Sequence, residues 1–219
     1  MNLTTPSLLR RLAFCSLLFA CLCSTGCNVG GALAYKFFGP TRDPAEYTPP
    51  KDQPLVVIVE NFRNPADLQQ PADELAMMIS GKLAGAKVAP IIPTDRLVAL
   101  RTEQGAAFEK LKIPEIGRAL GAKQIVYVNL RQCTFQGVIG ADDVKCNVEA
   151  VVKVVDVETG VTKYPDAGDG KVFKNNTDFN RSEGRKTEES IRMAVLDDLS
   201  DGITQLFYAH QPESELPKD

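Results

Sequence analysis

The sequence predicts an α/β fold (α+β is the alternative), in which helices pack on a mixed β-sheet and a long helix ends the chain. Three observations predict it. Residues 55–59 (LVVIV) form a short β-branched run of the kind found in buried strands. Residues 124–157 hold two long strand-like segments, and residues 187–208 place an apolar side chain at every fourth position. We expect one α/β domain over residues 54–209.

The first part of this domain is predicted to alternate strands and helices. After the strand at 55–59, Pro71 favours the first turn of a helix that Gly85 ends. Residues 88–92 (VAPII) predict a second short strand. A β-α-β arrangement of this kind indicates a sheet with helices packed on it.

Two shorter helices are predicted next. Thr94 or Asp95 is suited to capping the first of them, because a side-chain oxygen at that position can accept a backbone N–H. The second helix follows Pro114 and stops at Gly121. In the sequence, both helices come after the first strand and before the long strands that begin at residue 124.

The rest of the domain is predicted to be a strand meander followed by one helix. The turn DVETG places Gly160 where a positive φ is needed. Thr187 can cap the last helix, and two acidic residues follow it in the first turn. The expected strands cover residues 124–135, 144–157, 161–164 and 171–173.

Residues 1–26 have the anatomy of an export signal. Arg10 and Arg11 precede an apolar run over residues 12–23, and small residues then lead to Cys27. The run is shorter than the roughly 20 apolar residues that a membrane-spanning helix needs. The cysteines inside the run have no histidine or paired cysteine motif near them, so we interpret Cys27 as an attachment point and not as a metal ligand.

The stretch STGC resembles the lipobox of bacterial lipoproteins, although Ser24 stands where that family has an aliphatic residue. The resemblance implies cleavage between Gly26 and Cys27 and lipidation of Cys27. Asn28, which is not Asp, implies sorting to the outer membrane, facing the periplasm. The alternative is cleavage at the A-x-A site of residues 32–34, which would give a soluble secreted or periplasmic product.

The remaining chain outside the domain is predicted to be a tether and a tail. Residues 27–53 are rich in Pro and Gly, which favours an extended, semi-rigid spacer between the lipid and the domain. Residues 210–219 are polar and form a C-terminal tail. The membrane is therefore an expected partner, reached through the N-terminal lipid.

Composition argues against nucleic-acid binding and against the common forms of catalysis. Arg10 and Arg11 are the only charged side chains in the first 26 residues, so their removal takes the net charge from −3 to −5. An acidic chain without a basic stripe is poorly suited to a phosphate backbone. The only histidine is His210, and the usual nucleophile, zinc and phosphate-loop motifs are missing. We expect no enzyme activity, metal or cofactor.

Cys133 and Cys146 flank the predicted hairpin and leave three alternatives open. The export signal permits a disulfide between them, but they could also be two buried thiols, or one could be reactive. Strand alternation, with Val126, Val128 and Leu130 on the core face, puts Cys133 on the side of the sheet opposite to Cys146. A single β-bulge would bring both to the same face.

Three segments resemble exported bacterial domains such as the N-terminal domain of TolB and the curli-secretion channel lipoproteins. They are PLVVIVENF, IGRALGAKQIVYVNL and VVKVVDVETGVTKY. The resemblance implies a periplasmic domain that works by contacting other envelope proteins. The leading hypothesis is a non-catalytic, lipid-anchored binding or assembly module. The alternatives are a small-ligand carrier or enzyme with an unrecognised carboxylate and basic site, and a structural subunit of a homo-oligomer.

Overall fold

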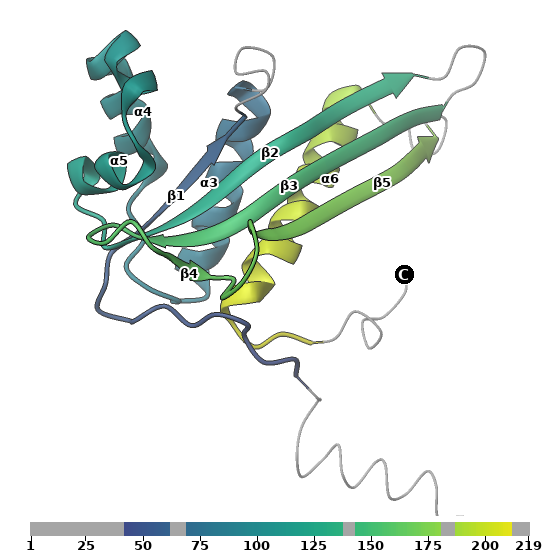
Figure 1. Ribbon diagram of the computed structural model, residues 1–219. Helices are drawn as coiled ribbons and strands as arrows, with labels where there is room; N and C mark the ends of the chain where they lie inside the picture. The colour runs from purple at the N-terminus through teal and green to yellow at the C-terminus, as the bar shows by residue number, and fades with distance from the viewer. Residues whose placement is uncertain (1–41, 62–68, 138–142, 181–186, 212–219) are drawn as a thin grey trace, which may run out of the picture. The chain divides into compact units, whose positions relative to one another are not determined.

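The computed structural model describes residues 42–61, 69–137, 143–180 and 187–211 (Figure 1). Residues 44–210 form one compact unit. The predicted leader, the cleavage site at Gly26 and the lipidation site at Cys27 lie outside the described residues, as does most of the predicted tether. So does the C-terminal tail beyond residue 211.

The described strands form one mixed five-stranded sheet, which confirms the predicted fold class. β1 runs parallel to β2, whereas β2 and β3 are antiparallel. β4 and β5 follow each other along the far edge of β3, both antiparallel to it. The strands are β1 (Leu55–Glu60), β2 (Gln124–Gly137), β3 (Asp143–Asp156), β4 (Thr162–Tyr164) and β5 (Lys171–Asn180).

The helices form two groups on opposite faces of the sheet. α3 and α6 pack side by side on one face, and α4, η1 and α5 cover part of the other face at its β1 end (Figure 1). The long C-terminal helix is present, with a final 3-10 turn. The bounds are α3 (Gln69–Gly85), α4 (Thr94–Gln104), η1 (Gly105–Lys110), α5 (Ile113–Leu120), α6 (Glu188–Thr204) and η3 (Gln205–Phe207).

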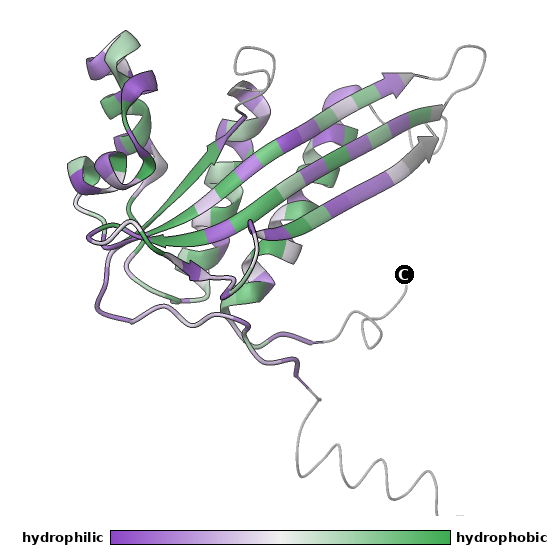
Figure 2. Ribbon diagram, in the orientation of Figure 1, coloured by the Kyte–Doolittle hydropathy of each residue, from purple (hydrophilic) through white to green (hydrophobic). Residues whose placement is uncertain are grey.

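Two apolar cores lie on the two sides of the sheet, and β1 contributes to both. Leu55, Val57 and Val59 face the larger core under α3 and α6, whereas Val56 and Ile58 face the smaller core under α4 and α5. A strand buried on both faces reads as an unbroken apolar run, which explains LVVIV. Figure 2 shows the long strands alternating between apolar and polar residues, because only part of their second face is covered.

The predicted strand at residues 88–92 is wrong. Only Ile91 forms an isolated parallel bridge, with Leu55 at the edge of β1. The segment still forms two backbone hydrogen bonds with Leu55. The Leu55 N–H donates to Pro90 O (2.9 Å), and the Ile92 N–H donates to Leu55 O (2.8 Å). Pro90 and Pro93 lack the N–H groups that a longer ladder needs, so pairing is limited to this single bridge.

The helix ends follow the predicted signals in two cases and depart from them in a third. Gly121 ends α5 with φ 76°, and Thr187 caps α6 by accepting the Ser190 N–H at 3.1 Å. For α4 the prediction is wrong, since the N-cap position is Pro93 and no side chain caps the helix. Thr94 is buried instead, with its hydroxyl 3.4 Å from the Ser80 hydroxyl of α3.

Residues 44–53, called the N-terminal strap here, contact the domain although the sequence assigns them to the tether. The N–H groups of Glu46 and Tyr47 both donate to Leu206 O at 2.9 Å. The Tyr47 hydroxyl donates to Gln124 Oε1 at 2.8 Å, and its ring meets Phe207 edge-on at 6.2 Å. The compact unit therefore begins at residue 44, ten residues before the predicted boundary.

Candidate functional site

A hollow of about 790 Å³ opens on the second face of the sheet, beside the carboxyl end of β1. We call it the β1–α5 hollow. Its floor is formed by side chains of β1, β2 and β3, and its roof by the segment from α4 to the start of α5. The volume is within the range of small-molecule sites, roughly 300–1,000 Å³.

The floor brings together residues from three neighbouring strands. In the sheet register Ile58 lies beside Tyr127, and Tyr127 lies beside Lys153, so the three form one row across the sheet. The Lys153 ammonium lies 5.3 Å from the centre of the Tyr127 ring. Glu60, two residues after Ile58, points to the same face and also lines the hollow.

The roof is mainly apolar and carries one guanidinium. Phe108 of η1, together with Leu111, Ile113 and Pro114, supplies the apolar surface. Arg101 of α4 lies 5.5 Å from the centre of the Phe108 ring, within cation–π range. The same guanidinium forms a salt bridge with Asp73 of α3, with 3.1 Å between Nη1 and Oδ1.

The electrostatics of the hollow are set by burial. Burial raises the pKa of the Glu60 carboxyl above its ordinary value, and the nearby Arg101 only partly offsets this effect. Burial also raises the pKa of the Tyr127 phenol, and the neighbouring Glu60 adds to the shift. Lys153 forms no salt bridge with any residue that the structure describes. Burial in the hollow thus disfavours the charged form of Glu60, and Lys153 has no salt-bridge partner among the described residues.

Glu60→Gln is expected to stabilise the protein at neutral pH. Because the pKa of Glu60 is raised on folding, the native state binds its proton more tightly, and stability is lost as pH rises from about 4.5 through the folded pKa. Glutamine cannot ionise, so the variant escapes this loss. Thermal unfolding at pH 4 should give equal Tm values for the two proteins, and at pH 8 the variant should be higher. An equal difference at both pH values would contradict the assignment.

The hollow is equipped for binding and lacks the common catalytic pairs. Its described lining holds no histidine, cysteine or serine, so the common Ser–His and Cys–His pairs are not found there. Among the described residues, no group of three His, Cys, Asp or Glu side chains lies close enough to hold a metal ion. Apolar walls with a few convergent polar groups are the usual composition of ligand sites.

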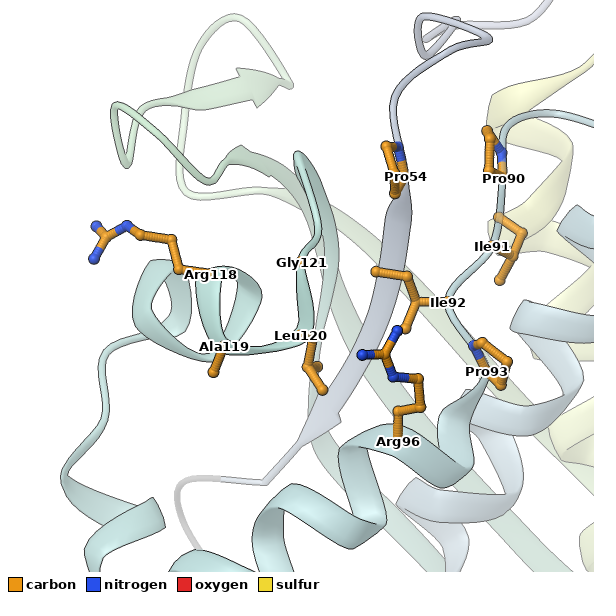
Figure 3. Close-up of a pocket in the computed structure, with 10 residues that line it drawn as sticks. All are labelled: Pro54, Pro90, Ile91, Ile92, Pro93, Arg96, Arg118, Ala119, Leu120 and Gly121. Atoms are coloured by element: carbon orange, nitrogen blue, oxygen red, sulfur yellow. The ribbon is translucent and has the colours of Figure 1, made fainter.

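A second depression, of about 470 Å³, lies between the start of β1, the start of α4 and the end of α5 (Figure 3). Prolines 54, 90 and 93 line it, with Arg96 and Arg118 as its charged residues. The Arg96 side chain lies over the depression beside Ile92, whereas Arg118 extends away from it (Figure 3). With one charged group over it and no partner of opposite charge in its lining, it is the weaker candidate.

Cys133 and Cys146 lie on the same face of the sheet, because the bulge that this requires is present. The register of β2 shifts between Leu130 and Gln132, and both cysteines are buried in the larger core. They are not direct partners, since Cys133 faces Val148 and Cys146 faces the residue two positions after Cys133. In the structure both are thiols, with no disulfide between them.

Both cysteines are expected to resist alkylation in the native protein. Burial raises the pKa of the Cys133 thiol to about 11, which leaves little thiolate at neutral pH. Iodoacetamide at pH 7.5 followed by peptide mapping should leave both unlabelled, whereas both should be labelled in urea without reductant. Labelling in urea only after reduction would establish a disulfide instead.

The residues of the hollow were missed by the sequence reasoning. Glu60, Arg101, Tyr127 and Lys153 lie on four elements and share no motif. Two of them carried a signal: Glu60 directly follows an apolar run, and Lys153 interrupts another in VVKVV. A charged residue inside a strand that is otherwise buried on both faces indicates a gap in the cover over one face.

No family model matches this chain, and no curated protein matches it. Solved structures with a similar chain trace include lipoprotein GNA1162 from Neisseria meningitidis, with 11% identity and a TM-score of 0.44 over 71% of this chain and 99% of that one. A PelC dodecamer from Paraburkholderia phytofirmans has 12% identity and a TM-score of 0.43 over 77% of this chain and 96% of that one. The hypothetical protein CT253 from Chlamydia trachomatis has 13% identity and a TM-score of 0.41 over 71% of this chain and 97% of that one.

The described helices include none that is both long enough and apolar enough to cross a membrane.

Proposed function

We propose that the protein is a non-catalytic module of the bacterial envelope, anchored by a lipid on Cys27, which binds a small ligand in the β1–α5 hollow. The observation that carries the proposal is the hollow itself. It combines a volume of about 790 Å³, apolar side chains in its roof and floor, and charged side chains from the four elements β1, α4, η1 and β3. A concave site with this composition favours small-ligand binding among the sequence-based hypotheses.

Obstruction of the hollow tests the binding function. Thr162 lines its mouth and is exposed, so Thr162→Trp should fill the entrance without disturbing the core. Its neighbour Val161 is 57% exposed and does not line the hollow, which makes Val161→Trp the matched control. In native mass spectrometry of protein released gently from cells, a small-molecule adduct should be present in the wild type and in the control and absent from Thr162→Trp.

An adduct that persists in Thr162→Trp would overturn the hollow as the binding site, and so would the absence of any adduct from all three proteins. The same spectra give the mass of the native particle. They therefore show whether the chain assembles with itself or with other envelope proteins, as the two other hypotheses require.

The N-terminus of the mature protein tests the anchor. We expect mass spectrometry to find a chain that begins at Cys27 and carries acyl groups, and membrane fractionation to place it in the outer membrane. Cys27→Ser should abolish acylation and release the protein from the membrane fraction. A mature chain that begins after Ala34 would replace the anchor by a soluble product.

A further inference from the structure

We propose that the ligand of the β1–α5 hollow is an amphipathic anion, whose apolar body lies under the roof and whose acidic head group binds Lys153. This inference rests on the proposed function and names its ligand class. It follows from the order of side chains on the floor, from the balance of charges in the lining and from the position of the Lys153 ammonium.

Polarity changes in one direction along the floor. The row that contains Val155 pairs with Ile125 of β2 and Val56 of β1, so it is entirely apolar, and α5 covers its inner part. The next row along the sheet ends in Tyr127 and Lys153, and the one after it begins with Glu60. A ligand that lies across these rows needs an apolar end near Val155 and a polar end near Lys153.

The roof supplies an apolar surface above the floor. Phe108, Leu111 and Ile113 face the hollow from above, and Phe108 is 7% exposed because the helices around it cover most of its ring. Burial of an apolar body against these side chains stabilises the complex at about 25 cal/mol per Å² of apolar surface removed from water. This contribution does not depend on the head group, so the head group decides the ligand class.

The charges in the lining favour an anion. Three cationic side chains line the hollow, Arg101, Lys112 and Lys153, against the carboxyl groups of Glu60 and Glu109. Arg101 is already neutralised by Asp73 through their salt bridge. Lys153 is only partly exposed and lies over the Tyr127 ring, where no described carboxylate neutralises it. A carboxylate or phosphate would supply the missing counter-charge through a charge-assisted hydrogen bond.

A fluorescent fatty acid tests this inference. The chain from residue 27 onward would carry Cys27→Ser, so that no covalent acyl group competes for the hollow. Titration with cis-parinaric acid should show saturable binding, which palmitate displaces and hexadecanol displaces poorly. Lysophosphatidate in place of palmitate distinguishes a phosphate head group from a carboxylate.

Lys153→Gln should raise the Kd for cis-parinaric acid roughly ten- to hundredfold, as expected when a hydrogen bond to a charged group is lost. Lys145 lies on the same strand and the same face, is exposed and does not line the hollow, so Lys145→Gln is the matched control and should bind like the wild type. Far-UV circular dichroism checks that both variants are folded.

Equal affinity of Lys153→Gln and the wild type, or equal displacement by hexadecanol and palmitate, would overturn the anionic head group. If Thr162→Trp still abolished the native adduct, the proposed function would stand and only the ligand class would be wrong. If cis-parinaric acid bound Thr162→Trp as well as the wild type, its binding would lie outside the hollow and the inference would fail.

Discussion

Phe207→Ala is expected to lower the free energy of unfolding by about 3–5 kcal/mol. Phe207 is 3% exposed and belongs to the larger core, so the substitution leaves a cavity in that core beside η3. It also removes the edge-on contact with Tyr47 of the N-terminal strap. The loss therefore affects the core and the docking of the strap together.

Urea unfolding followed by circular dichroism measures this change, since the chain contains no tryptophan whose fluorescence could report it. Phe207→Leu is the control, because it keeps most of the apolar volume and should cost less than half as much. A cost below about 1 kcal/mol for Phe207→Ala would show that Phe207 is not packed as the structure has it.

Gly170→Ala is the second substitution with a large expected effect, about 2–5 kcal/mol of destabilisation. Gly170 has φ 129°, which side-chain-bearing residues rarely adopt. A Cβ atom there would lie 2.5 Å from Val151 Cγ1 and 3.0 Å from the Val152 carbonyl oxygen of β3. Backbone strain and a steric clash act at the same position, just before β5 begins.

Gly168→Ala separates these two effects. Gly168 also has a positive φ, 88°, but a Cβ atom there would meet no atom within 4 Å. Its substitution should cost only the backbone strain, about 1–2 kcal/mol. Equal losses for the two variants in urea unfolding would mean that the contact with β3 contributes nothing.

Much of the fold could be predicted because local signals and tertiary packing agree. The apolar run of β1 reflects burial on both faces, and Gly121 and Gly160 mark turns at the positive φ values that the structure shows. Residues 88–92 look like a strand because their side chains are apolar, yet proline removes the N–H groups that a strand needs. Hydrophobicity alone could not distinguish a packed loop from a ladder.

The candidate site could not be predicted because it is made by strand register. Glu60, Tyr127 and Lys153 are separated by 67 and 26 positions along the sequence, and each is unremarkable where it stands. Parallel pairing of β1 with β2 and antiparallel pairing of β2 with β3 bring them to one surface. The strap escaped prediction for a similar reason, since its prolines indicate an extended chain but not what that chain contacts.

The docking of the strap gives the protein a mechanical property. If Cys27 is held in a membrane, tension on the chain enters the domain at residue 44 and acts first on the two hydrogen bonds to Leu206 O. Release of the strap also requires loss of the Tyr47 contacts with Gln124 and Phe207 and of the Glu46–Lys171 salt bridge. It would free ten residues, about 35 Å of extended chain, before force reached the hydrogen bonds of β1. The undocked strap would then lengthen the connection between membrane and domain, so that a displacement between them is taken up without deforming the hollow.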